Sequence, residues 1–164
     1  MKTIIIILTL FLSATVFSAE AQHEPKTDFE MGIMFSYINT SGFFLKYNID
    51  DDISVRGTGY IAKLDEYLYY NAKLTLSKTI HNSKYGEFYL LASAGLFSAD
   101  SGEATISDSN SVKLISLSAG LGYKYKIERG TNVFFEVEQN IMFLNGTEGF
   151  LFIPIPVMGI SVDF

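Results

Sequence analysis

Eight successive segments of this chain alternate apolar and polar residues with a period of two. In one of them Phe135 and Val137 alternate with Glu136 and Glu138. The segments are residues 28–38, 42–49, 53–62, 67–80, 86–97, 112–127, 132–144 and 150–164. Successive side chains of a β-strand point to opposite faces, so the pattern predicts an all-β fold whose strands each have one apolar face.

The last segment shows the alternation most clearly. One face holds Met158, Ile160, Val162 and Phe164, and the other holds Gly159, Ser161 and Asp163. Alternation alone does not say whether the apolar face meets a protein core or lipid, since a half-buried strand of a soluble β-sandwich has the same pattern. The other segments are needed to choose between these surroundings.

The connections between segments differ in length. Those after the second, fourth and sixth segments, including residues 81–85, are short turns, whereas those after the third, fifth and seventh are polar loops, of which residues 98–111 form the longest. Short turns at one end and longer loops at the other are typical of outer-membrane barrels. We therefore predict an eight-stranded antiparallel up-and-down transmembrane β-barrel over residues 28–164, with both termini periplasmic.

Residues 1–21 have the features of a signal peptide. A positive start at Met1 and Lys2 precedes an apolar stretch and a small-x-small sequence that ends at Ala21. We expect cleavage there, export of the protein and a flexible leader at residues 22–27. The rest of the chain lacks the run of about 18 apolar residues that a transmembrane helix requires.

Composition excludes several classes of function. The chain has no cysteine, which excludes disulfides, thiol catalysis and Cys-ligated metals. The formal net charge of −6 argues against nucleic acid as a partner, because nucleic-acid binding needs a basic surface.

The predicted polar face carries as many acids as bases. The acids are Glu30, Glu87, Glu136, Glu138 and Asp163, and the bases are Lys46, Arg56, Lys73, Lys124 and Lys126. Buried charges must be paired, so a balanced set could fill a narrow lumen with ion pairs. A solvated surface also mixes both signs, so this balance supports a lumen without proving one.

Four of these charges lie close together in the sequence. Glu136 and Glu138 face Lys124 and Lys126 across a short turn at residues 128–131. A gate or ion path is one interpretation, and a structural salt-bridge plug is the one we favour, since eight-stranded barrels have room inside only for side chains.

The apolar face favours lipid as its surroundings. It is nearly free of charge, and aromatic residues such as Tyr47, Tyr125 and Phe143 lie near strand ends, where interfacial girdles require them. The segments are also long enough for tilted transmembrane strands of about 9–11 residues. A soluble exported barrel of the lipocalin kind is the alternative.

The chain resembles the small OmpA/OmpX-like eight-stranded outer-membrane β-barrel proteins of Gram-negative bacteria, over residues 28–164. In that family a closing strand that ends on an aromatic residue is the assembly signal, which implies recognition of Met158, Ile160, Val162 and Phe164 by the barrel-assembly machinery. Pro154 and Pro156 depart from the pattern. Proline cannot donate to a strand ladder, so we expect the first half of the last strand to be irregular or both prolines to lie above the membrane.

The chain carries no catalytic motif that we recognise. Its two histidines are His23 in the leader and His81 in a predicted turn beside Ser83. We expect a non-enzymatic barrel without cofactor or metal, monomeric, in contact with outer-membrane lipid and lipopolysaccharide. Its role would be structural or one of surface interaction through the loops. A narrow channel or carrier for a small or hydrophobic solute is the alternative.

Overall fold

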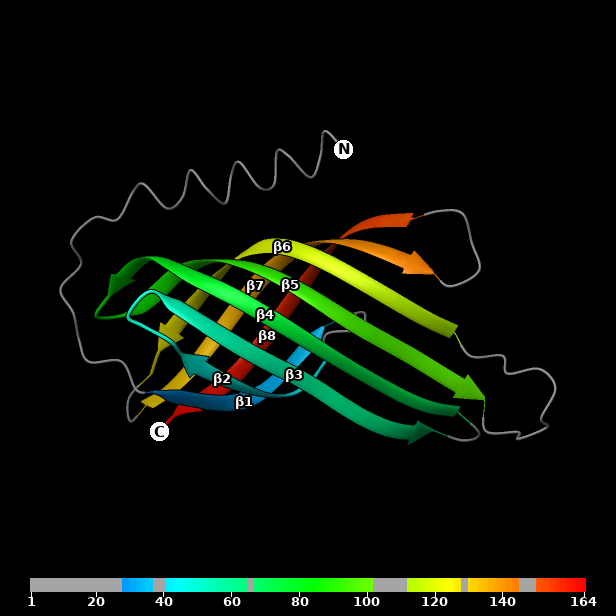
Figure 1. Ribbon diagram of the computed structural model, residues 1–164. Coiled ribbons are helices and arrows are strands. Elements are labelled where there is room, and N and C mark those ends of the chain that lie inside the picture. Colours follow the sequence, from blue (N-terminus) through cyan, green and yellow to red (C-terminus); the bar gives the residue numbers. More distant parts are fainter. Residues whose placement is uncertain (1–27, 37–40, 65–66, 102–111, 128–129, 145–149) are drawn as a thin grey trace.

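The computed structural model is a closed barrel in which eight antiparallel strands follow one another in chain order (Figure 1). It describes residues 28–36, 41–64, 67–101, 112–127, 130–144 and 150–164. The predicted signal peptide and leader lie outside these residues. The predicted all-β class, the number of strands and the antiparallel order are confirmed.

The strands agree closely with the eight alternating segments. Their bounds are β1 Phe29–Ser36, β2 Gly42–Asn48, β3 Ile53–Leu64, β4 Tyr67–Ser83, β5 Gly86–Ser101, β6 Val112–Lys126, β7 Thr131–Leu144 and β8 Phe150–Asp163. The β2–β3 and β4–β5 turns lie at the same end of the barrel as the C-terminus, which we call the terminus end (Figure 1). We call the opposite end the loop end.

Three predicted connections are shorter in the structure than in the sequence pattern. β4 continues to Ser83, and only residues 84–85 form the turn that was expected over 81–85. A register shift between Thr79 and His81 interrupts the alternation there, which hid the end of the strand. β3 and β5 also run past their predicted ends, to Leu64 and Ser101, because the residues there still pair with β4.

The prediction of an irregular start to the last strand is wrong. β8 pairs with β7 without a register shift along its length, and both Pro154 and Pro156 belong to this ladder. The amide of Phe164 donates to the carbonyl of Phe29 at 3.0 Å, and amide directions alternate along a strand, so even-numbered residues of β8 direct their nitrogens toward β1. The described β1 ladder reaches only to Val157, so neither proline removes one of its hydrogen bonds.

The two faces of the wall have opposite character. On β6, Ser116 is 3% exposed whereas its neighbour Leu117 is 49% exposed, and Lys124 is buried whereas Tyr123 is exposed. Polar and charged side chains fill the inside, and large apolar side chains cover the outside of all eight strands. In the part of the chain that the structure describes, no helix is long and apolar enough to cross a membrane.

Three aromatic rings lie close against glycines of the neighbouring strand. The register pairs Phe44 with Gly32, Tyr89 with Gly122 and Phe134 with Gly159. An ideal Cβ on each glycine would lie 2.3–2.8 Å from atoms of the paired ring, so no other residue type fits without displacing it. These pairs hold large rings against the wall and leave the axis of the barrel to charged side chains.

Candidate functional site

The lumen is the candidate site, and the structure places the ten charged residues of the predicted polar face on its wall. Eight of them are at most 9% exposed: Glu30, Lys46, Arg56, Lys73, Glu87, Lys124, Glu136 and Glu138. Lys126 and Asp163 lie nearer the terminus end and are half-buried. The five acids and five bases balance, so the described interior is close to neutral.

Arg56 and Glu136 form the central ion pair. The guanidinium donates twice to the carboxylate, at 2.7 and 2.8 Å, and the hydroxyl of Tyr89 donates to the same carboxylate at 2.6 Å. Arg56 also lies 5.5 Å from the ring centroids of both Phe44 and Phe134. A bidentate pair between two aromatic rings is held in one geometry, which suits a fixed plug better than a mobile gate.

A second pair crosses the lumen beside the first. The ammonium of Lys73 on β4 donates to both oxygens of Glu138 on β7, at 2.7 and 2.5 Å. The hydroxyl of Ser118 donates to Glu138 at 2.7 Å. Glu138 therefore accepts three hydrogen bonds from side chains of two strands and has no exposed surface.

Glu30 accepts contacts from three strands toward the terminus end. Its Oε2 lies 3.1 Å from Nζ of Lys46 and 3.2 Å from Nζ of Lys124, and the hydroxyl of Ser161 donates to Oε1. β1, β2, β6 and β8 are thus joined through one carboxylate. This contact spans the seam where β1 closes the barrel against β8.

Glu87 extends the same network. It lies 3.3 Å from Lys124 and 3.5 Å from Lys126, and Lys126 also donates to Oδ1 of Asn82 at 3.1 Å. Lys126 is the more exposed base, with 22% of its side chain accessible. The network therefore ends near the β4–β5 turn, where solvent competes for its charges.

The pairing predicted from sequence is wrong. Glu136 and Glu138 form their ion pairs with Arg56 and Lys73 rather than with the bases of β6. In the β6–β7 register Glu136 lies opposite Gly122 and Lys124 lies opposite Phe134, so the residues are offset along the strands. The acids reach across the lumen instead, as a narrow barrel allows.

Asp163 is bound by a neutral side chain at the terminus end of the barrel. It accepts a hydrogen bond from Nδ2 of Asn132 at 2.9 Å. The two residues belong to β8 and β7 at the terminus end, so this contact ties the last residue of β8 to its neighbouring strand.

An apolar cluster lines the side of the lumen that β7, β8, β1 and β2 form, and it was not expected from the sequence. It consists of Met34, Phe44, Phe134, Met142, Ile155 and Val157, all at most 5% exposed. They belong to β1, β2, β7 and β8. The rings of Phe44 and Phe134 lie beside Arg56, whereas Met142 and Ile155 lie nearer the loop end than these rings. The signal was present as apolar residues on an otherwise polar face, but the pattern alone does not say that they gather at one place.

Side chains leave little open space between the charges. A cavity lined by Glu30, Arg56, Tyr89, Lys124 and others has a volume of about 10 Å³. Such a volume holds about one water molecule. The arrangement fixes strands to one another and offers no room there for a solute.

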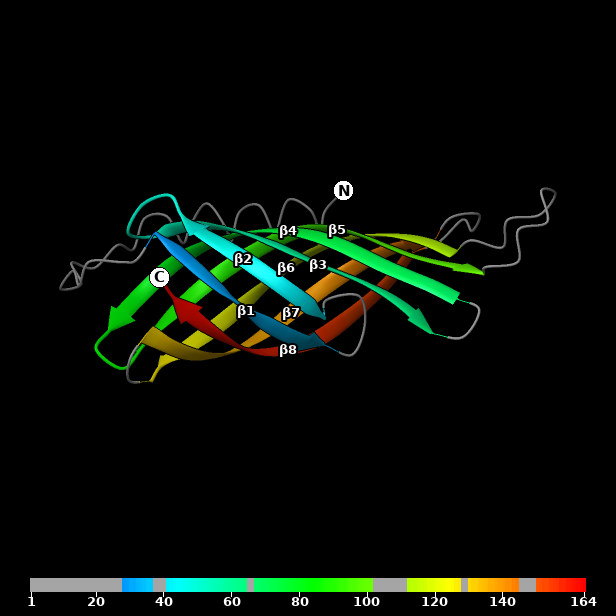
Figure 2. The same cartoon turned by 90° about the horizontal axis from the view of Figure 1, so that it is seen from below.

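The four residues of the expected assembly signal all point outward. Met158, Ile160, Val162 and Phe164 are 57%, 44%, 46% and 56% exposed. Phe164 stacks on Phe29 of β1 with ring centroids 6.0 Å apart. Seen from below, β1 lies between β2 and β8, so this outward row continues around the closing seam (Figure 2).

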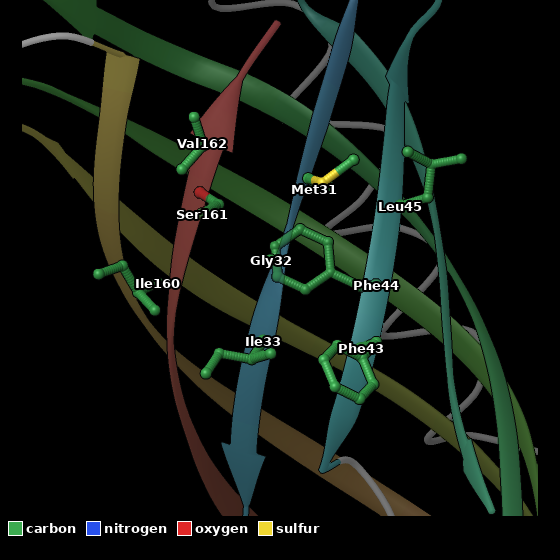
Figure 3. Close-up of a pocket in the computed structure, with 9 residues that line it drawn as sticks. All are labelled: Met31, Gly32, Ile33, Phe43, Phe44, Leu45, Ile160, Ser161 and Val162. Carbon is green, nitrogen blue, oxygen red and sulfur yellow. The ribbon is translucent and has the colours of Figure 1, made fainter.

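A shallow groove of about 710 Å³ runs along the outside of this seam. Figure 3 shows Ile33, Phe43 and Ile160 along it, with Gly32 beside the ring of Phe44. Gly32 has no side chain, so the ring of Phe44 can lie against β1 in the space that a Cβ would need. The groove is apolar and carries no catalytic group.

The residues considered for chemistry have structural roles where they are described. Ser83 donates to the carbonyl of Gly86 at 3.0 Å and accepts from its amide, so it caps the β4–β5 turn. His81 is exposed on β4, and His23 lies outside the described residues. Within the described ranges, no three His, Cys, Asp or Glu side chains are grouped so that they could hold a metal ion.

Comparison with known proteins agrees with the fold. No protein-family model matches the chain, and no curated protein matches it in sequence. Among solved structures, the N-terminal β-barrel domain of OprF from Pseudomonas aeruginosa is similar, with a TM-score of 0.55, 13% identity and coverage of 83% of this chain and 95% of that one.

The crystal structure of Ail, the attachment invasion locus protein of Yersinia pestis, gives a TM-score of 0.45 and 17% identity over 83% of this chain and 93% of that chain. The likeness to OprF concerns the fold alone. It agrees with the predicted resemblance to small eight-stranded barrels.

Proposed function

We propose that this protein is a non-enzymatic integral outer-membrane β-barrel, with both termini periplasmic and a role in envelope structure or in surface interaction through its loop end. The observation that carries this proposal is the inverted distribution of its side chains. Ion pairs fill the lumen, and apolar residues such as Phe43 (73% exposed), Ile61 (80%) and Leu74 (61%) cover the outside.

A soluble barrel does not account for this distribution. Monomeric soluble proteins rarely expose contiguous apolar patches above a few hundred Å², whereas here such residues surround all eight strands. A lipocalin-like protein would also need an apolar cavity inside. The described lumen instead holds Arg56, Glu136, Lys73 and Glu138 in close contact. Lipid is the solvent that suits the outer face.

The height of the apolar face supports the same proposal. On β6 outward residues run from Ile115 to Tyr125, ten residues along the strand. At about 3.3 Å per residue and a tilt of about 40°, this stretch spans about 25 Å along the barrel axis, the height of the apolar band of known outer-membrane barrels. Tyr123 and Tyr125 then lie at the terminus-end interface, where aromatic girdles form.

Fractionation tests this proposal. We expect the protein to remain with the outer membrane through salt and alkaline washes, to require detergent for extraction, and to migrate faster on a gel when unheated than when boiled. Recovery in the soluble periplasmic fraction without a mobility shift would overturn the proposal.

Conductance tests the alternative of a channel. The charged plug and the cavity of about 10 Å³ support a closed lumen. We expect planar bilayers that contain the purified barrel to show no stepwise conductance above the empty bilayer. Regular single-channel steps would favour a narrow channel, and we would then abandon the structural role.

A further inference from the structure

Two hollows meet on the outer wall of β3–β6. The first, of about 590 Å³, is bordered by outward-facing Gly57, Gly59, Ala72 and Ala94, and the second, of about 390 Å³, lies nearer the loop end. They share Leu96 and Ile115, so they form one groove that runs along the barrel. We call it the β3–β6 groove.

Small outward residues on three neighbouring strands create this groove. A Cβ on Gly57 would have no atom within 4 Å, and the register pairs Gly59 with Ala72. The neighbouring Leu74 is 61% exposed and stands along the side. A depression with such borders suits a flexible hydrocarbon chain, which fills space that side chains leave open.

A polar row crosses the loop end of the groove. Tyr70 pairs with Ser98, and Ser98 pairs with Lys113, so the three residues lie side by side on β4, β5 and β6. All three line the second hollow, where Lys113 is exposed and Ser98 is 2% exposed. The next row toward the terminus end contains Leu96 and Ile115 and is apolar.

We propose that the β3–β6 groove binds one phosphorylated lipid A unit of lipopolysaccharide, with an acyl chain in the groove and a phosphate against Lys113. The proposal rests on the proposed function, which puts the loop end in the external leaflet. Lys113 supplies a cation for a charge-assisted hydrogen bond, and Tyr70 brings a hydroxyl group to the same level. A lipid with an anionic headgroup and an apolar acyl chain therefore complements both Lys113 and the groove.

The chain contains a matched control at the other end of the wall. Lys78 is also an outward lysine on this side of the barrel, but its register neighbours are Ile53 and Leu90. Its row therefore lacks a tyrosine hydroxyl like the one that Tyr70 brings to the row of Lys113. A general attraction between lysines and anionic lipids would affect both positions alike, whereas a built site would affect only one.

The test is lipid binding by the full-length barrel in nanodiscs, measured by native mass spectrometry. The probes are bisphosphorylated lipid A, the same lipid A without phosphates, and phosphatidylglycerol. We expect one lipid A per barrel, and we expect Lys113→Gln to weaken its binding about tenfold, as the loss of a charge-assisted hydrogen bond predicts. Lys78→Gln should change binding less than about twofold, since its row offers no second polar contact.

A second variant tests the groove independently of charge. Ala94→Phe should fill the groove and weaken the binding of lipid A both with and without phosphates, whereas Lys113→Gln should affect only the phosphorylated form. Equal losses in Lys113→Gln and Lys78→Gln, unchanged binding in Ala94→Phe, or equally tight binding of phosphatidylglycerol would each overturn the proposed site. Failure of the protein to enter nanodiscs would instead overturn the proposed function.

Discussion

The lumen has two parts that are filled in opposite ways. Toward the terminus end and the centre, buried charges such as Glu30 and Glu136 each accept contacts from several strands. Toward the loop end, apolar side chains such as Met142 and Ile155 pack together with 1% of their surface exposed. The stability of the charged part depends on every ion-pair partner being present, whereas that of the apolar part depends on how well the side chains fit together.

This difference has a physical consequence for mutation. Removal of one charge leaves its partner buried and uncompensated, and water cannot easily replace it. Removal of an apolar side chain leaves a cavity that neighbouring residues can partly fill. The two parts should therefore respond differently to single and to paired substitutions.

The largest effect is expected at the central ion pair. Glu136→Ala leaves Arg56 without its carboxylate, which should lower the free energy of unfolding by about 3–5 kcal/mol. Urea unfolding in lipid vesicles, followed by circular dichroism, measures it. The pair Arg56→Met with Glu136→Leu should recover most of the loss, and a double variant as unstable as Glu136→Ala would contradict this account of the charged part.

A cavity in the apolar part should cost somewhat less. Met142→Ala should lower the free energy of unfolding by about 2–4 kcal/mol, because Met142 is fully buried in the cluster. Met158→Ala removes the same atoms from the outer face, where lipid fills the space, and should cost less than about 1 kcal/mol. Equal losses in the same urea titration would show that the inside is not packed more tightly than the outside.

Glycines on the two faces of the wall differ in how closely other atoms approach them. Gly159→Ala would bring a Cβ within 2.3 Å of the Phe134 ring and 2.5 Å of the carbonyl of Ile33, so we expect a loss of about 1–3 kcal/mol. Gly57→Ala on the outer face meets no atom within 4 Å. It should leave the free energy of unfolding unchanged or raise it by up to about 1 kcal/mol. The temperature at which each variant loses its compact form on a gel compares the two. A Gly159→Ala variant as stable as the unchanged protein would show that the Phe134 ring does not need this glycine.

The smallest effect is expected at the exposed end of the network. Lys126→Ala should change the free energy of unfolding by less than about 1 kcal/mol, since its side chain is partly solvated and Glu87 keeps Lys124 at 3.3 Å. The change in the free energy of unfolding caused by Lys126→Ala should also stay small at every salt concentration. A loss similar to that of Glu136→Ala would mean that the charged part extends unchanged to the rim.

The sequence pattern predicted the strands well because alternation is a local property. Each strand of a barrel has one face toward lipid and one toward the lumen, so eight segments could be located without knowledge of their partners. The end of β4 was missed where the shift near Thr79 breaks the period.

The partners inside the lumen could not be predicted in the same way. The base that forms an ion pair with Glu138 is determined by the offset between strands and by the distance across the barrel. The alternation of polar and apolar residues predicts neither. Proximity in sequence suggested Lys124 and Lys126, whereas the register and the lumen width bring Lys73 to it. The apolar cluster has the same origin, since its members come from four strands.

The inverted distribution of side chains is the central claim, and spin labelling on β6 tests it most directly. The chain has no cysteine, so single cysteines can be placed at outward Leu117 and Leu121 and at inward Ser116 and Ser118. In lipid vesicles we predict that the outward labels are relaxed by oxygen and not by a polar nickel chelate, and that the inward labels are shielded from both. Outward labels that respond more strongly to the chelate than to oxygen would contradict the account.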